Sequence, residues 1–124
     1  MKKYNLLLLT LLFVSFVAAQ KPVIEFEKSN HDFGKITEEG GKADYNFVFT
    51  NKGGMPMVIS RVQASCGCTT PTWTKEPIAP GKKGSISVSY NPLGRPGAFT
   101  KTITVYSNAT EEQENLIIRG EVNP

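Results

Sequence analysis

The segment from Ser85 to Tyr90 most constrains what this chain can fold into. Serine alternates there with Ile86, Val88 and Tyr90, and a period of two residues places the three apolar side chains on one face of an extended strand. A sheet with one apolar face needs a second layer to cover it. The sequence therefore predicts packed layers of secondary structure, one of which contains this strand.

Short apolar segments separated by turn signals recur along the rest of the chain. We expect further strands within residues 23–26, 31–36, 45–49, 57–62, 99–105 and 116–122. The segment around Trp73 contains Pro71, which suits an edge strand or a loop because proline cannot donate a ladder hydrogen bond. No stretch has helical periodicity over the length of a helix. About seven short strands in a chain of this size predict an all-β sandwich.

Residues 1–19 have the features of a signal peptide. A basic start precedes an apolar run over residues 6–17, and small residues then lead to Ala19. This run is shorter than the roughly 20 residues of a membrane span. We predict cleavage between Ala19 and Gln20, export to the periplasm or the cell exterior, and one domain over residues 20–124. An uncleaved N-terminal anchor is the alternative.

The charge of the chain depends partly on this leader. The whole sequence has 14 basic and 11 acidic residues and a formal net charge of +3. Loss of Lys2 and Lys3 leaves 12 basic residues and a net charge of +1. Beyond the leader the longest basic run is the pair Lys82–Lys83. A phosphate-binding stripe is therefore missing, and we expect no nucleic acid partner.

Five segments of the chain carry a family resemblance. They are, in order, His31–Ile36, Phe47–Asn51, Val62–Thr69, Ile78–Gly81 and Val88–Pro92. Together they resemble the family catalogued as domain of unknown function 1573, and they span nearly all of the chain after the leader. The resemblance implies an immunoglobulin-like β-sandwich, of the PapD-like and sperm-protein-like kind, in an exported bacterial protein. It assigns no activity.

The segment Cys66-Gly67-Cys68 holds both cysteines and is the main candidate for chemistry. An exported protein meets oxidising conditions, which favour pairing of an even number of cysteines. In an extended strand the two Cα atoms would lie nearly 7 Å apart, at the limit of disulfide reach. We expect Gly67 to allow a tighter turn. A bond that closes so short a loop adds little stability and is labile, which suits redox chemistry better than scaffolding.

Two other roles for the cysteine pair stay open at this point. As thiolates, Cys66 and Cys68 could hold Cu(I), a soft ion. A closed zinc site would need four ligands, and the chain adds only His31 to the two sulfurs. Alternatively, the segment Ser65–Thr69 is simply a tight corner between sheets, with its cysteines acting as small apolar side chains.

The remaining candidates for catalysis are weak. His31 is the only histidine; as a base for Cys66 it would have to come within hydrogen-bond reach, and we expect a surface or capping position instead. The chain has neither a Gly-x-Ser-x-Gly elbow nor a second histidine for a triad. Trp73 and Tyr90 could anchor a partner or a glycan, although core or rim packing is the simpler expectation. We predict no catalytic residues.

The sequence thus favours a small, non-catalytic binding or structural module of the bacterial cell envelope. Its partner would be an envelope or secreted protein that docks on edge strands or end loops. The first surfaces to examine are the loop Asn91–Gly97 and the corner Cys66–Thr70. The alternative is a thiol redox or Cu(I)-binding protein that acts through Cys66 and Cys68.

Overall fold

The computed structural model describes residues 21–124, which form eight strands and no helix. The predicted cleavage site between Ala19 and Gln20 lies outside these residues, as does the predicted signal peptide. Within residues 21–124 no helix is long and apolar enough to cross a membrane. In chain order the strands are β1 (Ile24–Phe26), β2 (Asn30–Thr37), β3 (Ala43–Asn51), β4 (Ile59–Ala64), β5 (Thr69–Trp73), β6 (Lys83–Tyr90), β7 (Gly97–Ser107) and β8 (Gln113–Asn123).

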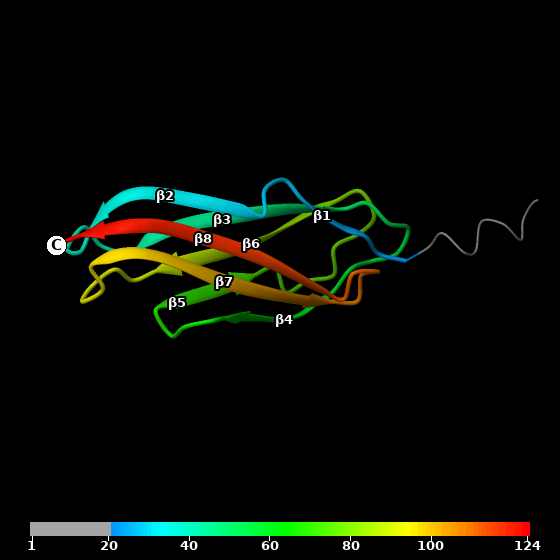
Figure 1. Ribbon diagram of the computed structural model, residues 1–124. Helices are drawn as coiled ribbons and strands as arrows, with labels where there is room; N and C mark the ends of the chain where they lie inside the picture. The colour runs from blue at the N-terminus through cyan, green and yellow to red at the C-terminus, as the bar shows by residue number, and fades with distance from the viewer. Residues whose placement is uncertain (1–20) are drawn as a thin grey trace, which may run out of the picture.

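The strands form two four-stranded sheets packed face to face (Figure 1). Sheet I has the order β1-β3-β6-β5 and sheet II the order β2-β8-β7-β4. Neighbouring strands are antiparallel except β2 and β8, which run parallel. This arrangement confirms the predicted all-β, immunoglobulin-like sandwich.

The N-terminal part of the sandwich changes sheets. β1 pairs with β3 in sheet I, whereas β2 pairs with β8 in sheet II, so the chain crosses between Phe26 and Asn30. The two strands were predicted separately, over residues 23–26 and 31–36. The eighth strand is β5, which the sequence left as an edge strand or a loop. Residues 27–29 contain no glycine or proline, so the sequence gives no turn signal for this change of sheet.

The core lies between the apolar faces of the two sheets. In β6, Ile86, Val88 and Tyr90 are at most 1% exposed, and the serines between them are more exposed. The rings of Tyr90 and Phe99 stack across the core with centroids 4.0 Å apart, which ties β6 to β7. Sheet II faces β6 with Phe99, Ile103, Val105, Leu116, Ile118 and Val122. The predicted apolar faces of these strands are confirmed.

The strand predicted from Met57 begins two residues later, at Ile59. Met57 instead forms an isolated bridge with Ile78, and its N–H donates to the Ile78 carbonyl over 2.9 Å. The N–H of Val58 donates to the side-chain oxygen of Asn108 over 2.8 Å. Loop contacts therefore hold these two residues, and the sequence pattern did not separate them from the strand.

β5 is an edge strand of sheet I, as its proline predicted. Pro71 lies opposite Val88. Just beyond the strand, the N–H of Thr74 donates to the Ser85 carbonyl over 3.1 Å. Counted back from Thr74, every second residue of β5 bonds to β6. Pro71 is three residues before Thr74 and is not one of these, so its nitrogen faces the open side of the sheet. Proline thus interrupts no ladder bond and blocks the edge.

Candidate functional site

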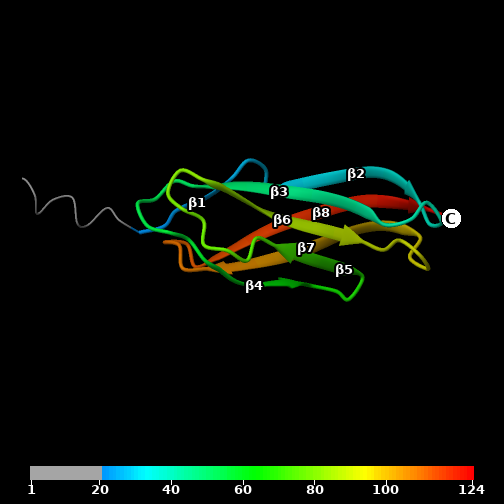
Figure 2. The ribbon, with the colours of Figure 1, turned by 180° about the vertical axis from the view of Figure 1, so that it is seen from behind.

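The cysteine segment links the two sheets along one side of the sandwich. β4 is the edge strand of sheet II, and β5 is the edge strand of sheet I. Both lie along the lower side of the views in Figures 1 and 2. The chain crosses between them in residues 65–68. The structure therefore has the tight corner between sheets that the sequence left as one alternative.

Cys66 and Cys68 form a disulfide at this corner. Their Cα atoms are 5.2 Å apart, which is closer than an extended chain allows and within the usual range for a disulfide. Gly67 does not have a positive φ, and a Cβ there would meet nothing within 4 Å. The expectation that glycine's special conformations enable the turn is therefore wrong, because an ordinary backbone makes it.

The two sulfur atoms lie in different surroundings. Cys68 is 3% exposed and belongs to the core, whereas Cys66 is half-buried at its margin. The backbone N–H of Cys68 donates to Cys66 Sγ over 3.0 Å. Cys68 Sγ lies 3.6 Å from Thr69 Oγ1. Reagents in solution therefore have better access to the Cys66 sulfur than to that of Cys68.

The β6–β7 loop begins directly beside this corner. The N–H of Asn91 donates to the Cys68 carbonyl over 2.9 Å, so the two surfaces singled out from the sequence are neighbours. Together we call the residues Cys66–Thr70 and Asn91–Gly97 the corner–loop surface. Its most exposed apolar side chain is Leu93, which is 61% exposed.

Side-chain contacts order the loop. Arg95 Nη1 donates to the Leu93 carbonyl over 3.1 Å and to the Asn91 carbonyl over 3.4 Å. The N–H of Gly94 donates to Glu38 Oε1 over 2.8 Å, which links the loop to the β2–β3 turn. Leu93 is thus presented to solvent by a loop whose backbone is held on two sides.

Lys101 was not predicted as a site residue, yet the strand register brings it to the corner. The N–H of Ser65 donates to the Thr102 carbonyl over 3.0 Å, which extends the β4–β7 ladder to residue 65. The paired residues end at Ala64 and Ile103, and the chain bends at Ser65 and Cys66; Lys101 is the β7 residue that one further step of the register would set opposite Cys66. Side chains alternate along a strand, so Lys101 shares the core-facing side of β7 with Ile103. The sequence signal available for Lys101 was its place in the alternating pattern of β7, between the apolar residues Phe99 and Ile103.

His31 lies on the other side of sheet II, since β8 and β7 separate β2 from β4. Its ring stacks on Tyr45 with centroids 3.7 Å apart and meets the edge of Phe33 at 4.6 Å. Burial, with a smaller contribution from the Lys28 charge, lowers the pKa of His31, and Asp32 partly opposes this shift. His31 is half-buried, so it lies at the margin of the surface with its ring packed on Tyr45 and Phe33. Three interstrand spacings, about 14 Å, separate the strands that carry His31 and Cys66, so His31 is no base for that sulfur.

Tyr90 and Trp73 were considered as anchors for a partner or a glycan, with packing in the core or at its rim as the simpler expectation. They pack in this simpler way. Tyr90 is 1% exposed and lies in the core. Burial raises its pKa, and the Arg95 charge acts in the opposite direction. Trp73 packs against the core while half-buried, with Lys75 Nζ 3.2 Å from the centre of its ring. Neither residue presents a free aromatic face for a partner or a glycan.

A metal site would need the cysteines in their reduced form. Within residues 21–124 no group of three or more His, Cys, Asp or Glu residues is placed to hold a metal ion. The disulfide sulfurs of Cys66 and Cys68 are not thiolates, and thiolates are the form that binds soft metals. Cu(I) binding by the reduced pair stays a prediction.

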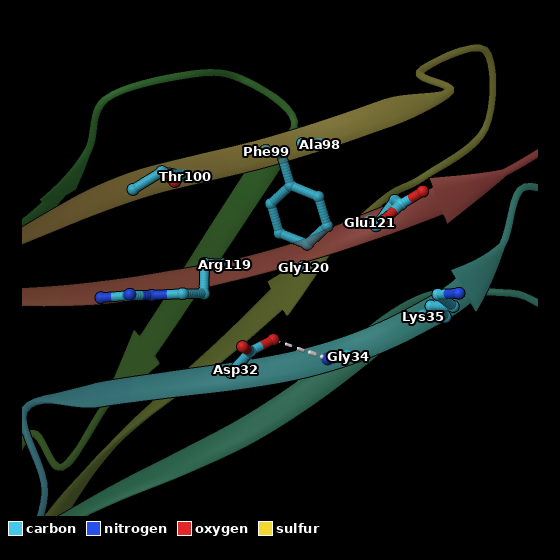
Figure 3. Close-up of a pocket in the computed structure, with 9 residues that line it drawn as sticks. All are labelled: Asp32, Gly34, Lys35, Ala98, Phe99, Thr100, Arg119, Gly120 and Glu121. Carbon is cyan, nitrogen blue, oxygen red and sulfur yellow. Dashed lines mark hydrogen bonds between the residues drawn. The ribbon is translucent and has the colours of Figure 1, made fainter.

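A shallow hollow of about 360 Å³ lies across β2, β8 and β7, away from the cysteines (Figure 3). The ring of Phe99 lies against Gly120, where a Cβ would approach it to 2.9 Å. The charged residues around the hollow are Asp32, Lys35, Arg119 and Glu121. With two acidic and two basic side chains, the rim favours neither anions nor cations. None of these residues had been singled out from the sequence as a site.

Residues 24–122 match the model of a family described as protein of unknown function (DUF1573). The chain belongs to the DUF1573 family. The match confirms the resemblance drawn from the five sequence segments, and the family description gives DUF1573 members no activity. No curated protein matches the chain.

Solved structures show the same fold as this DUF1573 chain at low sequence identity. A protein of unknown function from Porphyromonas gingivalis W83 has a TM-score of 0.72 and 18% identity, over 84% of this chain and 48% of that one. The ASH/PapD-like domain 7 of human CEP192 has a TM-score of 0.67 and 11% identity, over 83% and 87%. The secreted serine protease VesC from Vibrio cholerae has a TM-score of 0.60 and 13% identity, over 90% and 25%.

These similarities establish a PapD-like, immunoglobulin-like fold and nothing finer. The DUF1573 chain spans about half the length of the Porphyromonas protein. The fold occurs both in a domain described only by its fold and in a protease chain. The fold alone therefore does not assign a role to the DUF1573 chain, and the residues of the chain have to supply the evidence.

Proposed function

We propose that this DUF1573 domain is an exported, non-catalytic binding module of the bacterial cell envelope. Its partner, an envelope or secreted protein, docks on the corner–loop surface. The observation that carries this proposal is the presentation of Leu93, 61% exposed, on an ordered loop. Arg95 bonds to carbonyls within the loop, and Gly94 links the loop to Glu38 in the β2–β3 turn. An apolar anchor that is already ordered loses little conformational entropy when it enters a partner's pocket.

The free sheet edges support docking at this side of the sandwich. β1 has only three residues, the β2 ladder has a register shift between Asp32 and Lys35, and Pro71 blocks β5. β4 has its own register shift at its start, between Ile59 and Arg61, but beyond it the strand continues directly into the corner. Ser65 bonds to β7, so the backbone groups of Val62 and Ala64, which lie at the alternate positions, face the open side. A partner that covers the corner–loop surface can therefore also add a strand at β4.

Substitution of Leu93 tests the binding role. The protein, expressed from its full sequence with an affinity tag, would be used to isolate partners from envelope extract, beside the variants Leu93→Ser and Val58→Ser. Val58 is 40% exposed and lies outside the corner–loop surface, so it serves as the matched control. We expect one protein to be retained by the wild type and by Val58→Ser and to be lost with Leu93→Ser. Equal retention by all three would overturn the proposal.

Export is tested separately. Intact mass of the protein recovered from the envelope fraction should correspond to a chain that starts at Gln20. Recovery of the full-length chain from the cytoplasm would contradict export.

The second candidate function is the thiol chemistry of Cys66 and Cys68, and the disulfide at the corner favours it. Cu(I) binding is the metal form of this candidate. Titration with Cu(I) under anaerobic conditions should show one bound ion per chain after reduction and none in the disulfide form. Equal binding by the two forms would place any copper elsewhere.

A further inference from the structure

The cysteine pair is asymmetric, and this asymmetry decides which sulfur can exchange. Thiol–disulfide exchange requires an incoming sulfur to reach one of the two bonded sulfurs. Cys68 is 3% exposed, while Cys66 is half-buried at the margin of the corner. Attack from solution therefore falls on Cys66, and Cys68 is the sulfur that leaves.

The surroundings of Cys66 also favour its thiolate once the disulfide is open. The N–H of Cys68 donates to Cys66 Sγ over 3.0 Å, and a hydrogen bond donated to a sulfur stabilises its charged form. One step beyond the bond from Ser65 N–H to the Thr102 carbonyl, the β4–β7 register would set Lys101 opposite Cys66, and Lys101 is half-buried on the core-facing side of β7. An ammonium group near a thiol likewise favours the thiolate, which is the nucleophilic form.

The fold does not depend on this bond. The loop it closes is one of the shortest that a disulfide can close, so the bond removes little entropy from the unfolded chain. The corner is also held by backbone bonds, from Asn91 N–H to the Cys68 carbonyl over 2.9 Å and from Ser65 N–H to the Thr102 carbonyl over 3.0 Å. The disulfide can therefore open and close on a folded domain.

We propose that the corner is a thiol–disulfide exchange site for small disulfides, with Cys66 as the exchanging sulfur, Cys68 as the resolving sulfur and Lys101 as a positioning residue. This assignment specifies the second candidate function above and does not depend on the proposed docking partner.

The exchange begins on the reduced protein and proceeds in two steps. The Cys66 thiolate attacks one sulfur of a small disulfide, forms a mixed disulfide and releases the first small thiolate. The Cys68 thiolate then attacks Cys66 Sγ, closes the Cys66–Cys68 bond and releases the second. The protein loses two electrons and two protons, and the small disulfide becomes two thiols. A small thiol reverses these steps by attack on Cys66.

Single-cysteine variants test which sulfur exchanges. Alanine keeps position 68 small and apolar, so Cys68→Ala and Cys66→Ala would be compared after their folding is verified by thermal melting. With oxidised glutathione at pH 7, mass spectrometry should show a stable adduct on Cys68→Ala that forms at least about tenfold faster than on Cys66→Ala. The reduced wild type should lose two mass units and keep no adduct. Equal rates for the two variants, or a persistent wild-type adduct, would refute the assignment.

A pH profile tests the role of Lys101. The alkylation rate of Cys66 in Cys68→Ala would be measured against pH, alone and combined with Lys101→Met or with Lys82→Met. Lys82 is exposed in the β5–β6 turn and is the matched control. Lys101→Met should move the midpoint of the profile to higher pH, and Lys82→Met should leave it in place. Identical profiles would remove Lys101 from the site. No partner protein enters either measurement, so failure here leaves the docking proposal standing.

Discussion

Gly67 shows that a glycine in a tight corner is not always a conformational requirement. Its φ is not positive, and a Cβ added there would meet nothing within 4 Å. Gly84 is the opposite case, because a Cβ there would lie 2.6 Å from an atom of the Phe49 ring. That ring is fully buried and has no room to move.

We therefore predict that Gly67→Ala leaves the fold and the disulfide intact. The melting temperature should equal that of the wild type, and intact mass after alkylation should show no free thiol. Gly84→Ala should lower the free energy of unfolding by about 1–3 kcal/mol, as overpacking of a core does. A marked loss of stability or of the disulfide in Gly67→Ala would show that the corner needs glycine after all.

His31 makes stability depend on pH in a direction that its surroundings fix. The unfolded chain takes up a proton near the ordinary pKa of 6.5, whereas burial and Lys28 hold the folded ring neutral to lower pH. The unfolded state thus binds more protons as pH falls through this range, and the folded state loses stability. The stabilisation is complete above pH 6.5 and declines below it.

His31→Phe tests this dependence, because phenylalanine keeps the stack on Tyr45 without the titrating group. Melting temperatures would be compared at pH 7.5 and 5.5, where most carboxylates remain ionised. The wild type should lose more of its melting temperature across this interval than His31→Phe does. Equal losses would assign the pH dependence to other groups.

At the element scale, the sheet edges are defended unequally, and Pro71 protects β5. Its nitrogen faces the open side of sheet I and can donate no hydrogen bond to a second chain. Pro71→Thr would restore that donor without disturbing the bonds to β6. We predict that this variant melts like the wild type but associates with itself at high concentration, as measured by analytical ultracentrifugation. Pro77 is exposed and lies outside β5, so Pro77→Thr serves as the control and should keep the association state of the wild type. Association of both variants, or of neither, would argue against protection of the edge by Pro71.

The strands with a regular local pattern were the ones that the sequence predicted well. β6 alternates serine with apolar residues, and β3 carries Tyr45, Phe47 and Phe49 on one side, so a local window suffices for both. The crossing between β1 and β2 has no local marker, because pairing with β3 and β8 creates it. The bonds from Asn91 to Cys68 and from Ser65 to Thr102 likewise depend on register between strands distant in sequence. The candidate site could therefore be located by its cysteines but not completed from them.

At the scale of the whole molecule, stability comes from the sandwich core and not from the disulfide. Eighteen apolar residues form one continuous buried cluster. Cys66→Ser combined with Cys68→Ala should therefore melt close to the wild type, because the lost loop is so short. Far-ultraviolet circular dichroism with temperature provides the measurement. Collapse of this variant would mean that the corner staples the two sheets together, and reversible exchange on a folded domain would then be ruled out.

The parallel strands β2 and β8 are also placed to carry load along the sandwich. The chain enters at one end of the sandwich and leaves at the other, as Figures 1 and 2 show, and β2 and β8 run parallel along its length. A pull applied between the ends first loads β1, which pairs with β3, and then acts along β2 and β8 in opposite senses. Their hydrogen bonds are then stretched together in shear instead of opening one after another. The register shift between Asp32 and Lys35 divides that ladder into two blocks. A tether built from such domains would resist tension through the β2–β8 pair and leave the corner–loop surface out of the path of force.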